Sequence, residues 1–325
     1  MHPTHSTHPT HPMHPMHPMH PMHKTHLIAL FAALVFSACG QAPPEQQFID
    51  DAMEAIGGRS RVEAVKTLTL EGEGVNYNLG QDMKPEASGQ QFAITGYKRQ
   101  IDIANGRQRI EQTRTPKFAY FQGPQPQTQI QALDGAIAFN VNAQGQATRI
   151  PALAETDRHH DLYHHPLKLL RSTLDPKTTV GNVRSVGGAR QADITTAAGP
   201  TVTLSIGPGG EALSASSKAY QANLGDVVIT TTFGDFQDVS GLRLPARFAT
   251  KVDDFTTAEI RATRQTADTD VGDLAAPSAV AGSRPPTQPI NVVVQPIGKG
   301  VWLLAGGSHH TALIEFSDHL MLIDA

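Results

Sequence analysis

The 325-residue chain has a single cysteine, no excess of basic residues and no long apolar run, and each of these absences excludes a class of protein. A single cysteine cannot form an intramolecular disulfide, and it excludes zinc sites built from several thiolates. The formal net charge is −4, which argues against the basic surface of a nucleic-acid-binding protein. No apolar run reaches the ~20 residues that a membrane-spanning helix needs. The length alone predicts about two domains.

The first forty residues have the layout of a bacterial export signal. Lys24 precedes a short apolar segment, Leu27–Ala38, and the only cysteine follows at once. A basic stretch, an apolar stretch and small residues before the cleavage site are typical of secretory signals. Phe36-Ser37-Ala38-Cys39 resembles the lipobox of bacterial lipoproteins, although Phe36 stands where that motif usually has leucine. An ordinary secreted protein and a buried helix with a chance cysteine remain as alternatives.

The lipobox resemblance implies where the protein is located. It predicts a signal region over residues 1–38 and a lipidated Cys39, which would attach the protein to a membrane. Residues 39–47 would form a polar tether, and the rest of the chain would face the periplasm of the bacterial envelope. By resemblance to lipoprotein sorting, Gly40 after the cysteine favours the outer membrane.

The histidine-rich start of the chain cannot build a core. Nine of the 16 histidines lie at every third position from His2 to His26, and four His-Pro-Met triplets end at Met22. Proline prevents regular backbone hydrogen bonding, and methionine is the only apolar residue of the triplets. We interpret residues 1–21 as an incorrectly assigned start, with Met22 as the initiator. A weak metal-binding tail is the alternative.

Residues 48–272 are predicted to form one β-rich domain. Apolar residues recur at helical spacing over residues 48–56, and alternate with polar residues from Thr67 onward. Asn105-Gly106 and Asp134-Gly135 predict hairpin turns. A helical segment over residues 152–174 is split by Pro166. A run of strands with two helical insertions predicts an α+β fold, mostly β, in which helices cover one face of a curved antiparallel sheet.

Two short motifs add a family resemblance. Ala55-Ile56-Gly57-Gly58 stands before the first strand, and Phe233-Gly234-Asp235-Phe236 is followed by Gly241-Leu242-Arg243-Leu244-Pro245. Both motifs resemble the periplasmic lipoprotein carriers. The resemblance implies a half-barrel whose concave face binds an acyl chain or another hydrophobic ligand. A half-barrel that serves only as a scaffold is the alternative.

A second pattern follows a linker predicted over residues 273–289. Residues 290–325 carry four short apolar strands, and a Gly-rich loop with His309 and His310 separates the second from the third. Gly300–Ala305, this loop and Leu320–Ala325 resemble the opening of the metallo-β-lactamase-fold hydrolases. The resemblance implies the first strands of an αββα domain that is incomplete here. Asp324 would match the family's first-motif aspartate, and His309 and His310 would lie in a substrate loop.

The hydrolase resemblance leads to the main functional prediction. It implies a fragment of a zinc-dependent hydrolase, in which the full-length protein holds zinc. The family's His-x-His-x-Asp-His motif is absent from the 325 residues, so we expect the chain itself to be inactive and to hold no zinc. The alternative is a lipid-anchored carrier-like module that binds a hydrophobic ligand. A structural envelope lipoprotein is a third possibility.

Only one other cluster in the sequence indicates chemistry. His160 and His164 stand at i and i+4 in the predicted helical segment, which is the spacing of a metal-binding pair. No third ligand can be assigned, so they are weak metal candidates. The alternative is a polar helix junction before Pro166.

Overall fold

The computed structural model describes residues 42–79, 89–119, 121, 123, 125–221, 224–287, 291–306 and 309–324. By its contacts the chain divides into two units, residues 1–43 and Pro44–Ala325. The predicted signal region and Cys39 lie outside the described residues. In the part of the chain that is described, no helix combines the length and the apolar character required to cross a membrane.

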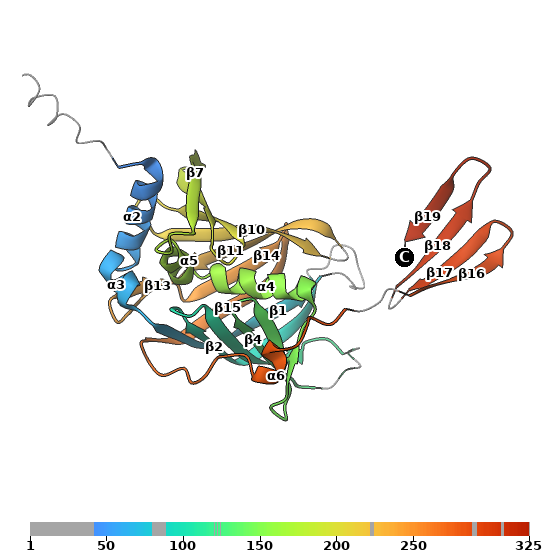
Figure 1. Cartoon of the computed structure of the whole chain (residues 1–325), viewed down its shortest axis with the longest axis horizontal. Helices are drawn as coiled ribbons and strands as arrows, with labels where there is room; N and C mark the ends of the chain where they lie inside the picture. Colours follow the sequence, from blue (N-terminus) through green and yellow to red (C-terminus); the bar gives the residue numbers. More distant parts are fainter. Residues whose placement is uncertain are drawn as a thin grey trace, which may run out of the picture. The chain divides into compact units, whose positions relative to one another are not determined.

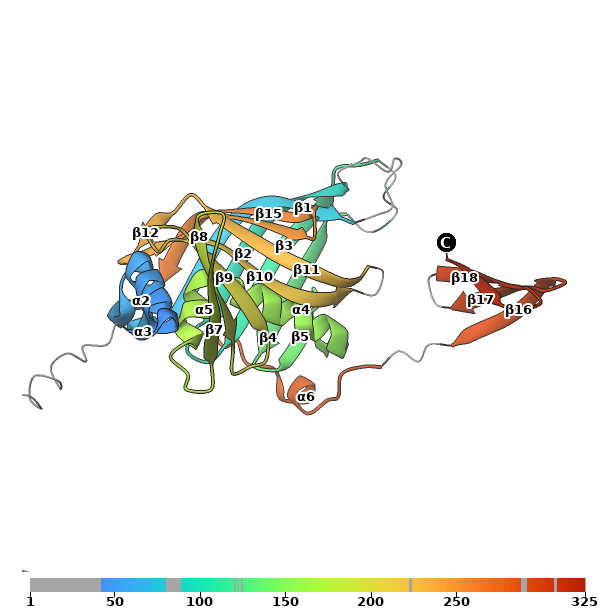
Figure 2. The ribbon, with the colours of Figure 1, turned by 90° about the horizontal axis from the view of Figure 1, so that it is seen from above.

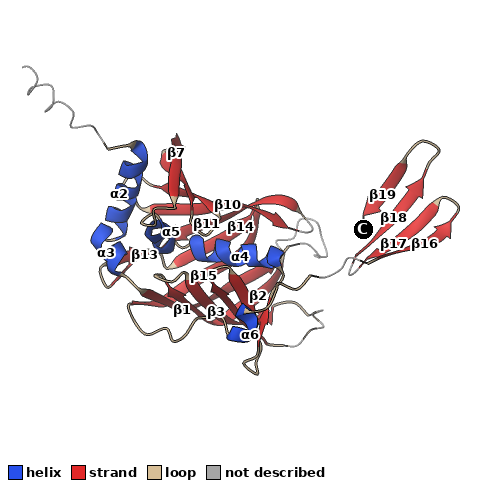
Figure 3. Cartoon of the chain, viewed as in Figure 1, coloured by secondary structure: helices blue, strands red, loops and turns tan. Residues whose placement is uncertain are grey.

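A thirteen-stranded antiparallel sheet dominates the second unit (Figures 1 and 3). Its strand order is β6-β5-β4-β3-β2-β1-β15-β14-β11-β10-β9-β8-β7, and a separate hairpin pairs β12 with β13. The strands are β1 (Thr67–Asn78), β2 (Gln90–Asp102), β3 (Arg107–Pro116), β4 (Gln127–Asp134), β5 (Ile137–Val141), β6 (Ala147–Arg149), β7 (Thr179–Val186), β8 (Ala189–Thr195), β9 (Thr201–Ile206), β10 (Ala212–Gln221), β11 (Gly225–Gly234), β12 (Gln237–Val239), β13 (Leu242–Leu244), β14 (Arg247–Val252) and β15 (Phe255–Ala267).

The sheet is curved and open. Helices lie within its curve when it is seen from above (Figure 2). The strand order ends at β6 on one side and at β7 on the other, and no pairing joins these two strands among those described. The prediction of a mostly β, antiparallel fold is therefore confirmed, and the open, curved sheet is consistent with the predicted half-barrel.

Local sequence signals explain several connections. The predicted hairpins form at the β2–β3 and β4–β5 turns, where Gly106 and Gly135 have φ values of 66° and 57°. This left-handed conformation is accessible to glycine without a steric penalty. Pro166 ends one helix and begins the next, as predicted, because proline cannot donate the hydrogen bond that would continue the first helix.

Helices α4 (Ala152–Tyr163) and α5 (Pro166–Ser172) lie within the curve of the sheet, and α2 (Pro44–Ile56) and α3 (Arg59–Ala64) lie at one end of it, where α2 contacts β7, β8 and β13 (Figure 2). Helix α2 buries one stripe of residues, namely Phe48, Ile49, Ala52, Met53 and Ile56. This stripe joins a core that also includes residues of α4, α5 and both wings of the sheet. Helix α4 contacts β4 and β5 as well as β10, so it bridges strands from the two wings.

The two motifs of the carrier resemblance meet in space. Gly57, at the end of α2, has a φ of 133° and packs so closely on the β12–β13 turn that a Cβ atom there would collide with the Gly241 carbonyl oxygen. Gly58 follows with a φ of 88°. Gly57 therefore has no space for a side chain, and the positive φ values of both residues favour glycine.

The predicted linker is partly ordered against the sheet. Helix α6 (Ser278–Ala281) buries Val280 against Ala132 and Phe139 of β4 and β5. The Ala276 backbone N–H donates to Asp134 Oδ2 at 2.9 Å. The Arg149 Nη1 donates to the Ser283 carbonyl at 2.6 Å. The chain is thus attached to the sheet as far as Ser283.

The end of the chain forms a separate four-stranded antiparallel meander. It consists of β16 (Val292–Gly298), β17 (Val301–Gly306), β18 (His309–Glu315) and β19 (Leu320–Asp324), in sequential order. Leu320 and Leu322 are 64% and 63% exposed. No helix accompanies these strands among described residues 291–306 and 309–324. The predicted αββα layering is therefore not shown.

The docking of α2 can be tested at Phe48, which is 0% exposed. Phe48→Ala removes a fully buried ring and leaves a cavity between α2 and the sheet. We expect it to lower the free energy of unfolding by about 3–5 kcal/mol in urea denaturation. Gln47→Ala, at the exposed neighbouring position, is the matched control and should change it little. Equal effects of the two substitutions would show that α2 does not pack as described.

Candidate functional site

A cavity of about 280 Å³ lies on the inner side of the sheet, with α4 on one side of it. Helix α4 and the segment after it contribute Asp157, His160, Asp161 and His164, whose spacing places them on one helical face. The sheet contributes Asn76, Tyr97, Arg99, Ile110, Gln112, Gln131, Gln221, Ile229, Thr231, Phe248, Thr250, Val252, Thr257, Ala258 and Ile260.

The two wings of the sheet give the cavity two different walls. Strands β11, β14 and β15 supply mainly apolar side chains, including Ile229, Phe248 and Ile260. Strands β2, β3 and β4 supply the polar side chains Arg99, Gln112 and Gln131 together with Tyr97 and Ile110. The cavity is therefore amphipathic, with an apolar wall facing a wall that carries hydrogen-bonding groups and a cation.

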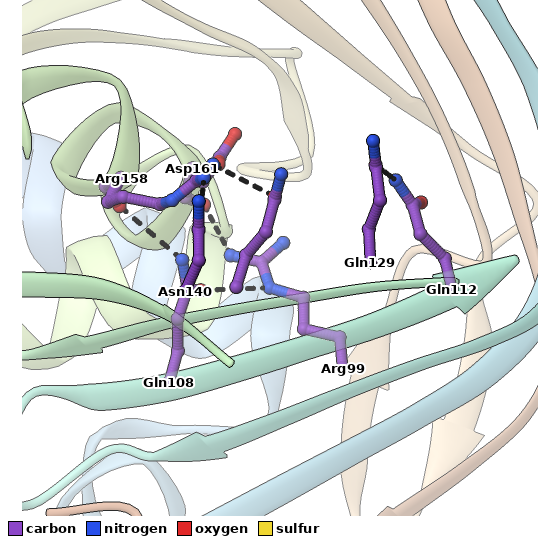
Figure 4. Close-up of polar contacts among 8 residues, drawn as sticks. Arg99, Gln108, Gln112, Gln129, Asn140, Arg158 and Asp161 are labelled. Carbon is purple, nitrogen blue, oxygen red and sulfur yellow. Dashed lines mark hydrogen bonds and ion pairs between the residues drawn. The ribbon is translucent and has the colours of Figure 1, made fainter. Parts of the chain in front are cut away.

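The helix break at Pro166 accounts for the position of Arg99. A continuing α-helix would satisfy the Asp161 carbonyl with the backbone N–H of His165, but that N–H donates to the Leu162 carbonyl instead. The Arg99 Nη2 donates to the freed Asp161 carbonyl, and the Arg99 Nε donates to Gln108 Oε1 at 3.2 Å. Arg99 thus caps the end of α4 from strand β2 (Figure 4).

Further polar contacts join α4 to β3, β4 and β5 (Figure 4). The Arg158 Nη1 donates to Gln131 Oε1 at 2.8 Å, and its Nη2 donates to Asn140 Oδ1 at 3.2 Å. The Gln108 Nε2 donates to the Arg158 carbonyl at 3.4 Å. Side chains of one wing therefore hold the helix through its backbone and through its longest side chain.

The other wing holds α4 through a buried chain of hydrogen bonds. Ser217 Oγ lies 2.6 Å from His160 Nδ1 and 2.8 Å from His164 Nε2. His164 Nδ1 lies 3.0 Å from Thr231 Oγ1, which lies 3.0 Å from Thr250 Oγ1. A neutral imidazole has one donor and one acceptor nitrogen, and a hydroxyl group can both donate and accept. Every hydrogen bond of this chain can therefore form with both histidines neutral.

Burial sets the charge of the groups on the α4 side. Desolvation, assisted by the neighbouring His160 and Arg99, lowers the pKa of His164 to about 3. Desolvation also lowers the pKa of His160. It raises the pKa of Asp157 to about 6, assisted by the Asp161 carboxylate. Both histidines are therefore neutral near pH 7.

The weak metal candidates share one helical face, as their spacing predicts, but they face hydroxyl groups. Both ring nitrogens of His164 and one of His160 are hydrogen-bonded to Ser217 and Thr231. Among the described residues, no group of three or more His, Cys, Asp or Glu side chains could hold a metal ion. Zinc is therefore not supported by the structure.

The predicted site residues of the terminal strands are not among the described residues that line this cavity. His309 and His310 begin β18, opposite Gly306 and Ala305 of β17, and Asp324 pairs with Thr311 in the same meander. Their suggested roles depended on the hydrolase resemblance. Cys39 lies outside the described residues.

Sequence reasoning missed the polar wall. Gln108, Ile110 and Gln112 alternate on β3 and are all buried, so their side chains share the inner face. The signal available in the sequence was the presence of glutamine at positions where a core strand normally has apolar residues.

Comparisons with known proteins give likenesses of fold only. No protein-family model and no curated protein matches the chain. A LolA superfamily protein from Nitrosomonas europaea is 10% identical, with a TM-score of 0.38 over 69% of this chain and 93% of that one. A DUF1329 family protein from Desulfovibrio piger is 12% identical, with a TM-score of 0.36 over 71% and 96%. LprF from Mycobacterium bovis is 10% identical, with a TM-score of 0.27 over 72% and 99%.

These findings correct the main functional prediction. The chain's likeness to solved structures is to the LolA superfamily, DUF1329 and LprF proteins, and the predicted fragment of a zinc-dependent metallo-β-lactamase-fold hydrolase is wrong. The described residues also lack a group of metal ligands. Short apolar strands around a Gly-rich loop are common to many β-sheets, so the terminal pattern was not specific.

The buried histidine predicts a pH dependence of stability. Unfolded His164 binds a proton below about pH 6.5, whereas folded His164 does so only near pH 3. The unfolded chain therefore binds more protons in this window, and the free energy of unfolding falls as the pH falls, by about 1.4 kcal/mol per pH unit for this group. His164→Gln should flatten the decrease, measured by urea denaturation from pH 7 downward.

The control for this experiment is an exposed histidine. His310 is exposed in the terminal meander, so His310→Gln should leave the pH dependence as in the unmodified protein. If His164→Gln gives the same slope as the unmodified protein, His164 is not held neutral by its surroundings.

Proposed function

We propose that the β-rich domain is a carrier-like binding module that holds an amphipathic ligand in the cavity beside α4. The observation that carries the proposal is the division of the cavity into an apolar wall from β11, β14 and β15 and a polar wall from β2, β3 and β4. A ligand with an apolar chain and a polar head fits such a cavity in one orientation. In this reading the curved sheet is a half-barrel, and α4 lies across its opening.

The physical terms of binding follow from the two walls. Each Å² of apolar ligand surface removed from water contributes about 25 cal/mol. Phe248, Ile229 and Ile260 provide that contact on one side. The amide groups of Gln112 and Gln131 can satisfy a polar head on the other side, so that the head is not buried without hydrogen-bond partners. A volume of about 280 Å³ is near the lower end for ligand sites, which favours a small or single-chain ligand.

Filling the cavity should abolish binding. Ala258 lies on β15 and lines the cavity, so the ring of Ala258→Phe would occupy the space of the ligand's chain. We expect the affinity for N-phenyl-1-naphthylamine, a neutral apolar dye, to fall by about tenfold or more in a fluorescence titration. Ala143→Phe introduces the same ring at an exposed turn and should bind the dye normally. Unchanged affinity of the Ala258 variant would refute binding at this cavity.

We further propose that Cys39 is lipidated and anchors the protein in the bacterial envelope, facing the periplasm, with the outer membrane as the favoured location. The support is the sequence pattern Phe36-Ser37-Ala38-Cys39 after the apolar segment. A lipid anchor would keep a carrier-like domain close to a source of amphipathic ligands.

Anchoring is tested by metabolic labelling in a bacterial host. An alkyne-modified palmitate should label the unmodified protein, which should sediment with membranes. Cys39→Ala removes the thiol that accepts the lipid, so the label should be lost and the protein should leave the membrane fraction. Ser37→Ala, which keeps a small residue before the cysteine, should be labelled normally. Labelling of the Cys39 variant would contradict the proposal.

A further inference from the structure

Arg99 is a buried cation without an anionic partner. Arg99 is only 7% exposed, and its described partners, which are Gln108 Oε1, the Asp161 carbonyl and the Tyr97 hydroxyl, are neutral. Many arginines of the domain do pair with carboxylates; Arg107, for example, contacts Asp134 at 2.7 Å. No carboxylate of a described residue comes within ion-pair distance of Arg99.

The uncompensated charge has a physical cost, because burial of an ion without a counter-ion is unfavourable. The carboxyl end of α4 offsets part of it, since a helix end carries roughly half a negative charge. No ion pair among the described residues neutralises the remainder, because the Asp161 carboxylate pairs with Arg158. Arg99 lines the cavity, so a bound molecule can reach its guanidinium.

We propose that the ligand is an anionic amphiphile whose carboxylate or phosphate head binds Arg99 while its apolar chain lies along the wall of β11, β14 and β15. This inference rests on the proposed binding function and names the chemical class of the ligand. A charged donor forms shorter and stronger hydrogen bonds to an oxyanion than a neutral donor does. Tyr97 and Gln112, which also line the cavity, can donate to the same head.

The acidic residues beside the cavity do not cancel this preference. The Asp161 side chain is 45% exposed and lies 3.8 Å from Arg158, which offsets its charge. Asp157 also lines the cavity, where desolvation and the Asp161 carboxylate raise its pKa to about 6, so its surroundings disfavour the charged form. Arg99 is buried, where the effective dielectric constant is lower and its charge acts more strongly on a bound head. His160 and His164 are neutral near pH 7, because burial lowers both pKa values.

The test compares head groups on one apolar chain. Dodecanoate, dodecyl phosphate, dodecanol and dodecylamine compete with N-phenyl-1-naphthylamine for the purified protein at pH 7.5. We expect at least one of the two anions to bind about tenfold or more tightly than dodecanol, and dodecylamine to bind most weakly. The relative affinity of the two anions distinguishes a carboxylate head from a phosphate head.

Substitutions test whether the preference for anionic head groups depends on Arg99. Arg99→Met should bring the anions to the affinity of dodecanol, while Arg99→Lys keeps a charge and should retain part of the preference. Lys168→Met is the matched control, because Lys168 is also 7% exposed and cationic but does not line this cavity. It should keep the full preference for anions.

The outcomes separate this inference from the proposed function. If no amphiphile displaces the dye, the binding function itself is wrong. If dodecanol binds as tightly as both anions, or Arg99→Met keeps the preference, the inference is overturned and binding stands. If Arg99→Met misfolds and no longer binds dodecanol, the inference is judged from the other two proteins. It is then overturned if the unmodified protein shows no preference for anions over dodecanol, or if Arg99→Lys shows the same preference as the unmodified protein.

Discussion

The attachment of α4 to both wings of the sheet is the constraint on which the rest of the site depends. On one wing, Arg99 and Gln108 bind backbone carbonyls of the helix. On the other wing, Ser217 binds both imidazoles and Thr231 binds that of His164. Because these contacts are polar and buried, the helix has one well-defined position. That position makes one wall of the cavity from α4 and leaves the apolar and polar wings facing each other.

Local elements of the fold were predictable because their causes are local. Asn105-Gly106 specifies a turn by backbone conformation, and Pro166 divides the helical segment by removing a donor. The spacing of His160 and His164 correctly placed both on one helical face. Their partners were not predictable, because Ser217 and Thr231 lie more than fifty residues further along the chain. Only the register of β10 and β11 brings these hydroxyls to the helix.

The same distinction explains the missed cation and the wrong family. Arg99 binds the Asp161 carbonyl, which lies 62 residues further along the chain. That carbonyl is free because the helix ends before Pro166, and nothing in the sequence of β2 indicates this. The terminal strands form a meander as their apolar pattern predicts, but such a pattern specifies strands and not the domain to which they belong. Periodicity therefore predicted secondary structure well, whereas the chemistry of the site depended on contacts between distant segments.

The two outermost strands of the large sheet have a consequence for solubility. Strand β6 has only three residues, which leaves little edge for another chain to pair with. Strand β7 is longer, but its register shifts between Gly181 and Arg184, and Asn182 has a φ of 54°. A bulge and a charged side chain at an edge both oppose the addition of a foreign strand. The sheet can therefore stay open without recruiting neighbouring molecules into β-aggregates.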